Sequence, residues 1–470
     1  MDEDTLDAAS SAARRDNEIA MIEEQSGSSE IILSSSEKTK RRIQRQQRQI
    51  TRLKESLSYR IGRHITIAVE KPWRIPFLPI TFPVYVFLLG MEKLGRRPRK
   101  KIETDYDSLN LENQKNISKD AIVFFPTNGV GFGHFTRLYA IARRLRKSNP
   151  DAEIIFFTTM PTLHIPYSEG FVTYHLAGRG KQKEMSASKW NMLLEEMLTL
   201  VFETHKPRAF VFDGAFPYRG MLNAIRENNS TKKIWVRRGM FKKGSKIPVD
   251  SIEHFDLIIH PGDAVEEKIT ELNHNAEIME TSAITLFHQN EMWAREKARR
   301  RIGIPRDCIG VYVQLGAGRI NDIESEVRMV IDSLLDNDKV HVVLGESMLG
   351  NRIDIEMEKV HIIRDYPNSM YLNAFDYSVQ AGGYNSFHEM RLMRLPTLFL
   401  PNMNTGMDDQ LSRCLEAEKE GWGIVNQDRA KSEINKDVNK MFELSNQEVE
   451  GNIPNGADEI SQRLSQMLLM

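Results

Sequence analysis

The stretch AGGYNSFHEMRLMRLPTLFLPNMNTGMDDQLSRCLEAEKEGWGIV, residues 381–425, decides the fold of the C-terminal part of the chain. An apolar strand predicted at 376–380 leads into the glycine pair 382–383, and a helical pattern follows from about Asn385. A second apolar strand comes next, and the polar triplet 408–410 begins another helix. In open α/β sheets, ligands bind beyond the carboxyl ends of the strands, where helix N-termini direct backbone N–H groups at phosphate. This order of elements therefore predicts a nucleotide site.

Glu389 lies one turn into the predicted helix, where its carboxylate can accept hydrogen bonds from both hydroxyls of a ribose. The order of GG, Ser386, Glu389, LP, LPN and DDQ resembles the C-terminal domain of glycosyltransferase family 28, the GT-B group of the peptidoglycan lipid-linked N-acetylglucosaminyltransferase. The resemblance covers about residues 121–425. It implies that Glu389 holds the nucleotide ribose. It also implies contacts with the donor for Gly383, Asn385 and Ser386, and with the donor sugar for Asp409 and Gln410. Family members more often have Gln-Gln or Asn-Gln where this chain has Asp-Gln, so the donor sugar stays open.

Length and composition indicate two packed domains and an appendage. The chain has 470 residues, of which 40% are hydrophobic, and a formal net charge of −1 that gives no general attraction to nucleic acid. Its two cysteines, Cys308 and Cys414, fall in segments with structured patterns, which favours a reducing cytosol over a disulfide framework. The acidic start MDEDTLDAAS has no apolar core and is not a secretory signal. We therefore expect a cytoplasmic protein.

The N-terminal arm has two parts of different composition. Residues 1–37 are polar, acidic and rich in serine, so we expect them to be disordered. The arm continues over 38–101, and isoleucine or leucine recurs there every seven residues between 43 and 57, which suggests a short heptad helix with many basic neighbours. Two interpretations of 43–57 stay open, a self-associating or docking helix and a solvated helix.

Residues 75–90, IPFLPITFPVYVFLLG, carry no charge and precede a cluster of Lys and Arg at 93–101. The segment is shorter than the ~20 residues of a spanning helix, and its three prolines predict a broken one. An apolar wedge beside a basic cluster favours peripheral contact with the inner, anionic face of the cell membrane. The alternative is an apolar strap that packs on the catalytic domain.

From residue 121 the pattern alternates between strands and helices, which predicts an α/β fold of two doubly wound, Rossmann-like domains facing across a cleft. We place the acceptor domain at 118–285, the nucleotide-sugar-binding domain at 300–450, and at 451–470 a C-terminal helix that packs back on the first half. Buried parallel strands are predicted at 121–126, 153–159, 209–214, 233–238 and 256–261, and then at 309–314, 341–345, 360–365, 376–380 and 397–401.

A glycine loop, NGVGFGH, follows the first strand and opens a helix. Its glycines lie two apart, and no acidic residue ends the second strand, so the loop does not fit NAD binding. It resembles the GxGH signature of the first domain in family 28, and this resemblance places Gly131, Gly133 and Arg137 on the acceptor side. Imidazole suits a base near pH 7, so His134 is a candidate catalytic base or acceptor ligand, with helix capping as the alternative. Asp213, at a strand end, orients His134, binds acceptor, or caps the next helix.

The second half begins with a strand and the loop LGAGR, whose Gly316, Gly318 and Arg319 suit a diphosphate. Tyr366 precedes the 376–380 strand, where it either covers the base or belongs to the core. The triplet DND at 336–338 falls in a turn, and the histidines have no metal-ligand spacing. We therefore expect no metal and no cofactor besides the nucleotide-sugar substrate.

Together these features predict an inverting, metal-independent glycosyltransferase of cell-surface glycan synthesis. It would move N-acetylglucosamine or another hexose from a UDP-sugar to a lipid-linked or polysaccharide acceptor. Basic residues in the loops 178–189 and 238–246 hint at an anionic acceptor such as a lipid diphosphate, and a solvated loop face is the alternative. Two other functions stay open, a UDP-sugar 2-epimerase, against which the GxGH loop argues, and a non-catalytic nucleotide-sugar-binding scaffold.

Overall fold

A computed structural model describes most of the chain from residue 53 onward. The described residues are 53–54, 56–93, 119–127, 131–182, 184–226, 228–238, 249–265, 275–316, 323–348, 352, 354–403, 408–445 and 453–469. The chain forms two compact units, Met1–Asn113 and Gln114–Met470. The predicted disordered segment 1–37 and most of the heptad helix lie outside the described residues.

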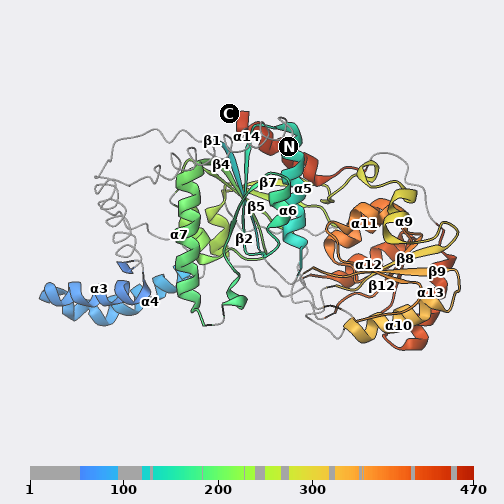
Figure 1. Cartoon of the computed structure of the whole chain (residues 1–470). Coiled ribbons are helices and arrows are strands. Elements are labelled where there is room, and N and C mark those ends of the chain that lie inside the picture. Colours follow the sequence, from blue (N-terminus) through green and yellow to red (C-terminus); the bar gives the residue numbers. More distant parts are fainter. Residues whose placement is uncertain are drawn as a thin grey trace, which may run out of the picture. The chain divides into compact units, whose positions relative to one another are not determined.

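The first unit contains a helical hairpin, coloured blue in Figure 1, made of α3 (Leu57–Glu70), the short η1 (Pro72–Phe77) and α4 (Leu78–Lys93). The prediction that prolines break this segment is wrong, because α4 runs through Pro83. Pro79 lies in the first turn, where its missing N–H has no helical acceptor, and Pro83 removes a single hydrogen bond. By length and composition alone, the 20 residues from Trp73 to Glu92 are long and apolar enough to cross a membrane.

The second unit begins with a seven-stranded parallel sheet in the order β3-β2-β1-β4-β5-β6-β7. Its strands are β1 (Lys119–Pro126), β2 (Glu153–Thr158), β3 (Val172–His175), β4 (Pro207–Asp213), β5 (Lys232–Val236), β6 (Leu257–Pro261) and β7 (Glu277–Thr281). Its helices are α5 (Gly133–Ser148), α6 (His164–Ser168), α7 (Ala187–His205) and α8 (Arg219–Arg226), with η3 (Arg179–Lys181) and η4 (Val249–His254). The five predicted strands are confirmed. The two edge strands β3 and β7 were missed, because their partly exposed residues lack an apolar run.

A second parallel sheet has the order β10-β9-β8-β11-β12-β13. Its strands are β8 (Ile309–Gln314), β9 (Val340–Gly345), β10 (Val360–Ile363), β11 (Tyr377–Gln380), β12 (Thr397–Phe399) and β13 (Gly423–Val425). Its helices are α9 (Arg295–Ile302), α10 (Ile323–Leu335), α11 (Tyr384–Met393), α12 (Gln410–Lys419) and α13 (Lys431–Glu443), with η5 (Gln289–Glu291) and η6 (Asn368–Ala374). The α/β fold with two doubly wound halves is therefore confirmed.

Both sheets are covered by helices on two faces, as all-parallel sheets require. In the first half, Ile122 and Phe124 pack with α5 and the C-terminal α14 (Gly456–Leu469), whereas Val123 and Phe125 pack with α7 and α8. Figure 1 shows α14 returning to the first sheet beside α5, as the sequence predicted. One apolar cluster continues from the first half into the second, which joins the two sheets into a single unit.

Candidate functional site

A cavity of about 370 Å³ lies between the two sheets, at the carboxyl ends of their strands. The first half contributes the start of α5 and Arg238, which follows β5. The second half contributes the ends of β8, β9 and β11 and the starts of α11 and α12. Ligands of open α/β sheets bind at such strand ends. The cavity is therefore the candidate ligand site, and both halves are needed to build it.

His134 is held at the cavity by Asp213 and Arg137. The Asp213 Oδ1 atom, at the end of β4, lies 2.7 Å from His134 Nδ1. Arg137, one turn further along α5, donates to both oxygens of Asp213, from Nε at 2.8 Å and from a terminal nitrogen at 2.7 Å. A terminal nitrogen of Arg137 also lies 2.9 Å from Nδ1, so Nδ1 either accepts from Arg137 or donates to Asp213. The tautomer in which Nδ1–H donates to Asp213 leaves Nε2 as the acceptor. The predicted pairing of Asp213 with His134 is thus present. Arg137, which was expected on the side of the acceptor substrate, forms hydrogen bonds with Asp213 and holds it in place.

Burial favours the neutral form of the His134 imidazole at pH 7. Burial lowers the pKa of His134 below its usual value, and the guanidinium groups of Arg137 and Arg238 lower it further, against the opposing effect of Asp213. Burial alone would raise the pKa of Asp213, but Arg137 and His134 outweigh it and hold that pKa below its usual range. An oriented, neutral imidazole beside a fixed carboxylate is the arrangement of a general base.

Glu389 lies on the second-half side of the same cavity, on α11. Burial raises the pKa of its carboxyl to about 7, although a hydrogen bond with the Ser369 side chain acts in the opposite direction. The carboxyl therefore keeps its proton to a higher pH than an ordinary glutamate does. Perturbed carboxyls of this kind are common at functional sites, where burial prepares them for a polar ligand.

Close packing explains the first glycine of the pair before α11. Gly382 has φ +80°, and a Cβ at this position would overlap the Cys414 sulfur. Gly383 is the N-cap of α11 and accepts a hydrogen bond from Ser386 Oγ at 3.1 Å. Asn385 donates its amide to the Gly133 carbonyl at 3.3 Å, across the cavity.

The three residues that were predicted to contact the sugar donor, Gly383, Asn385 and Ser386, all line the cavity, as do Gly131, Gly133 and Gly316. Gly318 and Arg319 lie outside the described residues.

The polar loop after β12 places its residues differently from the prediction. Asp409 is the N-cap of α12, where its side chain accepts from the Ser412 N–H at 3.1 Å and from the Ser412 hydroxyl at 2.8 Å. Asp409 is not among the residues that line the cavity, and its contact with the donor sugar stays a prediction. Asp408 and Gln410 do line the cavity, and the Gln410 amide donates to Asp408 Oδ2 at 3.3 Å. The carboxylate that faces the site is therefore that of Asp408.

Tyr366 packs against aromatic and polar side chains of the first half, which differs from the open ring face expected of a residue that covers the nucleotide base. Its ring stacks on Phe132 with 4.9 Å between centroids, and its hydroxyl lies 3.0 Å from Thr136 Oγ1. Phe132 and Thr136 belong to the first half. One face of Tyr366 is thus taken by Phe132, and the pair forms an aromatic contact between the halves at the cavity wall.

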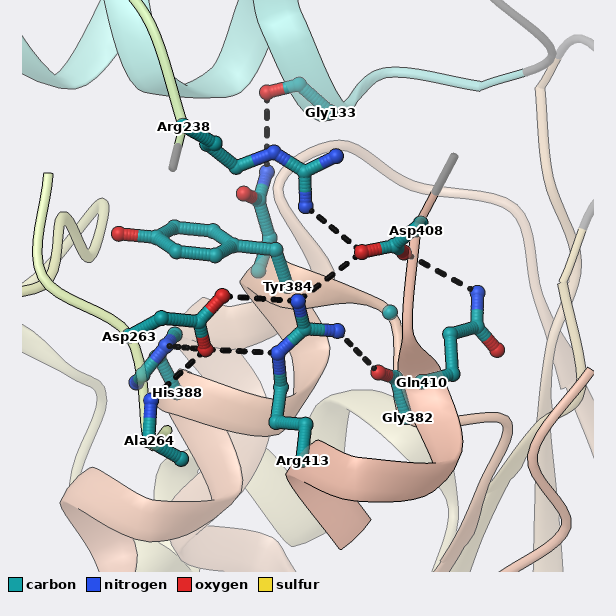
Figure 2. A network of polar contacts seen from close by, with 12 residues as sticks. Gly133, Arg238, Asp263, Ala264, Gly382, Tyr384, His388, Asp408, Gln410 and Arg413 are labelled. Carbon is teal, nitrogen blue, oxygen red and sulfur yellow. Dashed lines mark hydrogen bonds and ion pairs between the residues drawn. The ribbon is translucent and has the colours of Figure 1, made fainter. Parts of the chain in front are cut away.

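Sequence reasoning missed a buried ionic network that joins the two halves (Figure 2). Arg413, on α12, has a fully buried side chain and donates to both oxygens of Asp263 at 2.7 and 2.8 Å. It also donates to the Gly382 carbonyl at 2.9 Å and to Asp408 at 2.9 Å. Asp408 in turn accepts from Arg238 at 2.9 Å. Because Asp263 follows β6 and Arg238 follows β5, the network ties the first half to the helix that carries Gln410.

Aromatic and imidazole side chains complete this network. His388 Nε2 lies 3.1 Å from Asp263 Oδ1, and the Tyr384 hydroxyl donates to the Gly262 carbonyl at 2.9 Å. The guanidinium carbons of Arg137, Arg238 and Arg413 lie 5.3, 5.4 and 5.8 Å from the centre of the Tyr384 ring. One signal for the network was present in the sequence, since Arg413 occupies an apolar position of α12 beside Cys414 and one turn before Ala417.

Over the part of the chain that the structure describes, no group of three or more His, Cys, Asp or Glu side chains is arranged to hold a metal ion. The basic loop 178–189 is described except for residue 183, whereas 239–246 of the second basic loop lies outside the described residues. Arg238, the first residue of that loop, lines the cavity.

Comparison with known proteins identifies one curated relative. The chain is 22% identical over 334 residues to the UDP-N-acetylglucosamine--N-acetylmuramyl-(pentapeptide) pyrophosphoryl-undecaprenol N-acetylglucosamine transferase of Clostridioides difficile (strain 630), a match that covers 64% of this chain and 76% of the relative. No model of a known protein family matches. Similar solved structures include the spinosyn rhamnosyltransferase SpnG, at 13% identity and a TM-score of 0.46, which covers 74% of this chain and 95% of SpnG. They also include the UDP-GlcNAc 2-epimerase of Methanocaldococcus jannaschii, at 12% identity and a TM-score of 0.49, covering 74% and 99%.

Proposed function

We propose that this protein is an inverting, metal-independent glycosyltransferase that moves N-acetylglucosamine or another hexose from a UDP-sugar to a lipid-linked or polysaccharide acceptor. The observation that carries the proposal is the pairing of His134 and Asp213 on one side of a cavity whose other side holds Glu389. The first half thus supplies the base, His134, and the second half supplies Glu389 to bind the ribose of the same donor. The sequence similarity to a transferase that uses a lipid-linked acceptor supports the same class of reaction.

The chemistry follows from the roles of these groups. An acceptor hydroxyl attacks the anomeric carbon while the bond from that carbon to the diphosphate oxygen breaks, and UDP leaves. His134 Nε2 takes the hydroxyl proton as the new glycosidic bond forms. The backbone N–H groups at the start of α11, together with Arg238 at the cavity wall, can meet the charge on the leaving diphosphate without a metal.

Basic residues near the site and after α4 support the cellular location that we propose. Arg179 and Lys181 lie in η3 between β3 and α7, and Lys189 lies in the first turn of α7. The basic residues at 96–101 follow α4 in the sequence. Such groups suit an anionic acceptor and an anionic membrane surface. We therefore place the reaction in the cytoplasm, with the protein attached peripherally to the inner face of the membrane and no nucleic acid partner.

An acceptor-dependence assay tests the proposal against its alternatives. Purified protein is incubated with UDP-sugars, with and without a membrane lipid extract, and products are followed by mass spectrometry. Transfer requires the extract and yields UDP together with a glycosylated lipid. A UDP-sugar 2-epimerase converts the sugar without the extract, and a non-catalytic scaffold binds the nucleotide and yields no product.

The raised pKa of Glu389 predicts that UDP affinity depends on pH. Ribose hydroxyls donate hydrogen bonds to a carboxylate, so the ionised form binds best, and ionisation in the empty protein is completed only above pH 7. Calorimetry should therefore show tighter UDP binding at pH 8 than at pH 6, with a proton released on binding. At pH 8, Glu389→Ala should weaken UDP by about 1.5 to 3 kcal/mol, the range for hydrogen bonds to a charged group.

Glu389→Gln serves as the control for this prediction, because the amide keeps the shape of the side chain and cannot ionise. Its UDP affinity should change less between pH 6 and pH 8 than that of the original protein. If both proteins show the same pH dependence, the effect comes from the phosphate of UDP and the ribose role of Glu389 is wrong.

A further inference from the structure

The hairpin of α3 and α4 pairs its polar side chains on the inside. Arg60, near the start of α3, forms a 2.7 Å ion pair with Glu92, near the end of α4. His64 lies 3.3 Å from the Thr81 hydroxyl and stacks on the Tyr85 ring with 4.6 Å between centroids. These contacts show that the two helices run in opposite directions and meet along a polar seam.

Most of the large apolar side chains of the same hairpin point outward, although Leu89 is buried. Trp73, Ile80 and Phe87 are 65%, 70% and 67% exposed, and the other exposed ones from residue 75 to 86 are Ile75 at 50%, Phe77 at 56%, Val84 at 53% and Val86 at 40%. A helix of a hairpin in water buries its apolar groups and exposes its polar ones, and α4 does the reverse over most of its length. An apolar outer face behind a satisfied polar seam is the organisation of a helix in contact with lipid.

The charges on α3 decide how such a hairpin can enter a bilayer. Because the helices are antiparallel and paired, both must take the same angle to the membrane. Arg63 and Glu70 are exposed on α3, so a perpendicular hairpin would carry them into hydrocarbon, which is costly. In an orientation parallel to the surface, α4 sinks among the acyl chains and α3 stays at headgroup level. Residues 53–93 contain six Lys or Arg and three Glu, which favours anionic headgroups.

We propose that the α3–α4 hairpin is an in-plane membrane anchor, with α4 immersed in one leaflet of a phospholipid bilayer and α3 at its surface. This inference goes beyond the proposed transfer reaction, because it concerns a part of the chain outside both sheets and needs no donor or acceptor. It also changes the expected kind of attachment. Insertion of apolar side chains resists salt, whereas attraction between charges alone does not.

Vesicle flotation of the full-length protein tests the anchor. Vesicles of phosphatidylcholine, alone or mixed with phosphatidylglycerol, are compared at low and high salt. We expect binding that persists at high salt, and a loss of about tenfold or more in vesicle-bound protein for the variant Ile80→Glu/Phe87→Glu. The matched variant Ile80→Leu/Phe87→Leu keeps the apolar surface and should bind like the original protein. Complete release by salt, or equal binding of the Glu variant, would overturn the anchor in favour of charge attraction.

Two further measurements test whether a second copy of the chain covers the apolar face, and whether the hairpin lies in the plane of the membrane or spans it. A concentration-dependent dimer that is lost in the Glu variant, without vesicle binding, would show that a second copy covers the apolar face and would overturn the proposal. For orientation, a Val84→Trp variant in a Trp73→Phe background is bound to vesicles with bromines placed shallow or deep in the acyl chains. Stronger quenching by the shallow bromines supports the in-plane anchor, and stronger quenching by the deep ones indicates a spanning hairpin.

Discussion

Asp263→Ala is expected to destabilise the two-sheet unit by about 3–5 kcal/mol, the cost of removing one partner of a buried ion pair. The substitution removes two of the four hydrogen bonds that the fully buried Arg413 side chain donates, and it leaves those to Asp408 and to the Gly382 carbonyl. Burial would raise the pKa of Asp263, but Arg413 and His388 outweigh it and lower that pKa far below its usual range. The stabilisation is therefore present at neutral pH and is lost only as the pH falls into strong acid, because the folded-state pKa lies below the unfolded one.

Urea unfolding at pH 7 measures this effect. Asp332→Ala provides the matched control, because it removes the same side chain from an ion pair with Lys431 in which both partners are about half exposed. That pair should contribute at most about 1 kcal/mol. The double variant Asp263→Ala/Arg413→Met should recover part of the loss, since it removes the stranded charge. A loss for Asp263→Ala no larger than for Asp332→Ala would mean that water or another group satisfies Arg413.

His134→Ala is expected to lower turnover by about 10² or more with little change in UDP affinity, because the imidazole acts on the acceptor hydroxyl and not on the nucleotide. In the tautomer in which Nδ1–H donates to Asp213, Nε2 is the acceptor of the proton. Burial lowers the pKa of His134 below its usual value, so turnover at saturating UDP-sugar should fall only in solution more acidic than that in which an ordinary histidine takes up a proton.

Steady-state kinetics measures turnover and calorimetry measures UDP affinity, both on the same preparation. His164→Ala is a suitable control, because His164 also begins a helix, α6, but is exposed and does not line the cavity. Asp213→Asn should lower turnover as well, since an amide no longer favours the Nδ1–H tautomer. Equal losses in UDP affinity and turnover for His134→Ala would make His134 a donor-site or structural residue.

The sequence by itself determined the features that depend on neighbouring residues. Continuous apolar runs revealed the central strands, because both faces of a parallel sheet are buried and no polar alternation is needed. Glycine turns at strand ends located the start of α5 and α11, and with them His134 and Glu389 at one cavity. The edge strands β3 and β7 escaped this reasoning, because an edge buries too little surface to demand an apolar run.

The tertiary structure decided which distant side chains meet. Asp213 lies 79 residues from His134, and the pairing of β1 with β4 inside the first sheet brings them together. Asp263 lies 150 residues from Arg413, and the packing of the two sheets brings these two together. Because α12 begins at Gln410, Asp409 is its N-cap, and the preceding Asp408 faces the cavity. Pairing between α3 and α4 turned the polar side chains of the hairpin inward. Contacts of this kind depend on the arrangement of whole elements in space, which no local pattern of residues records.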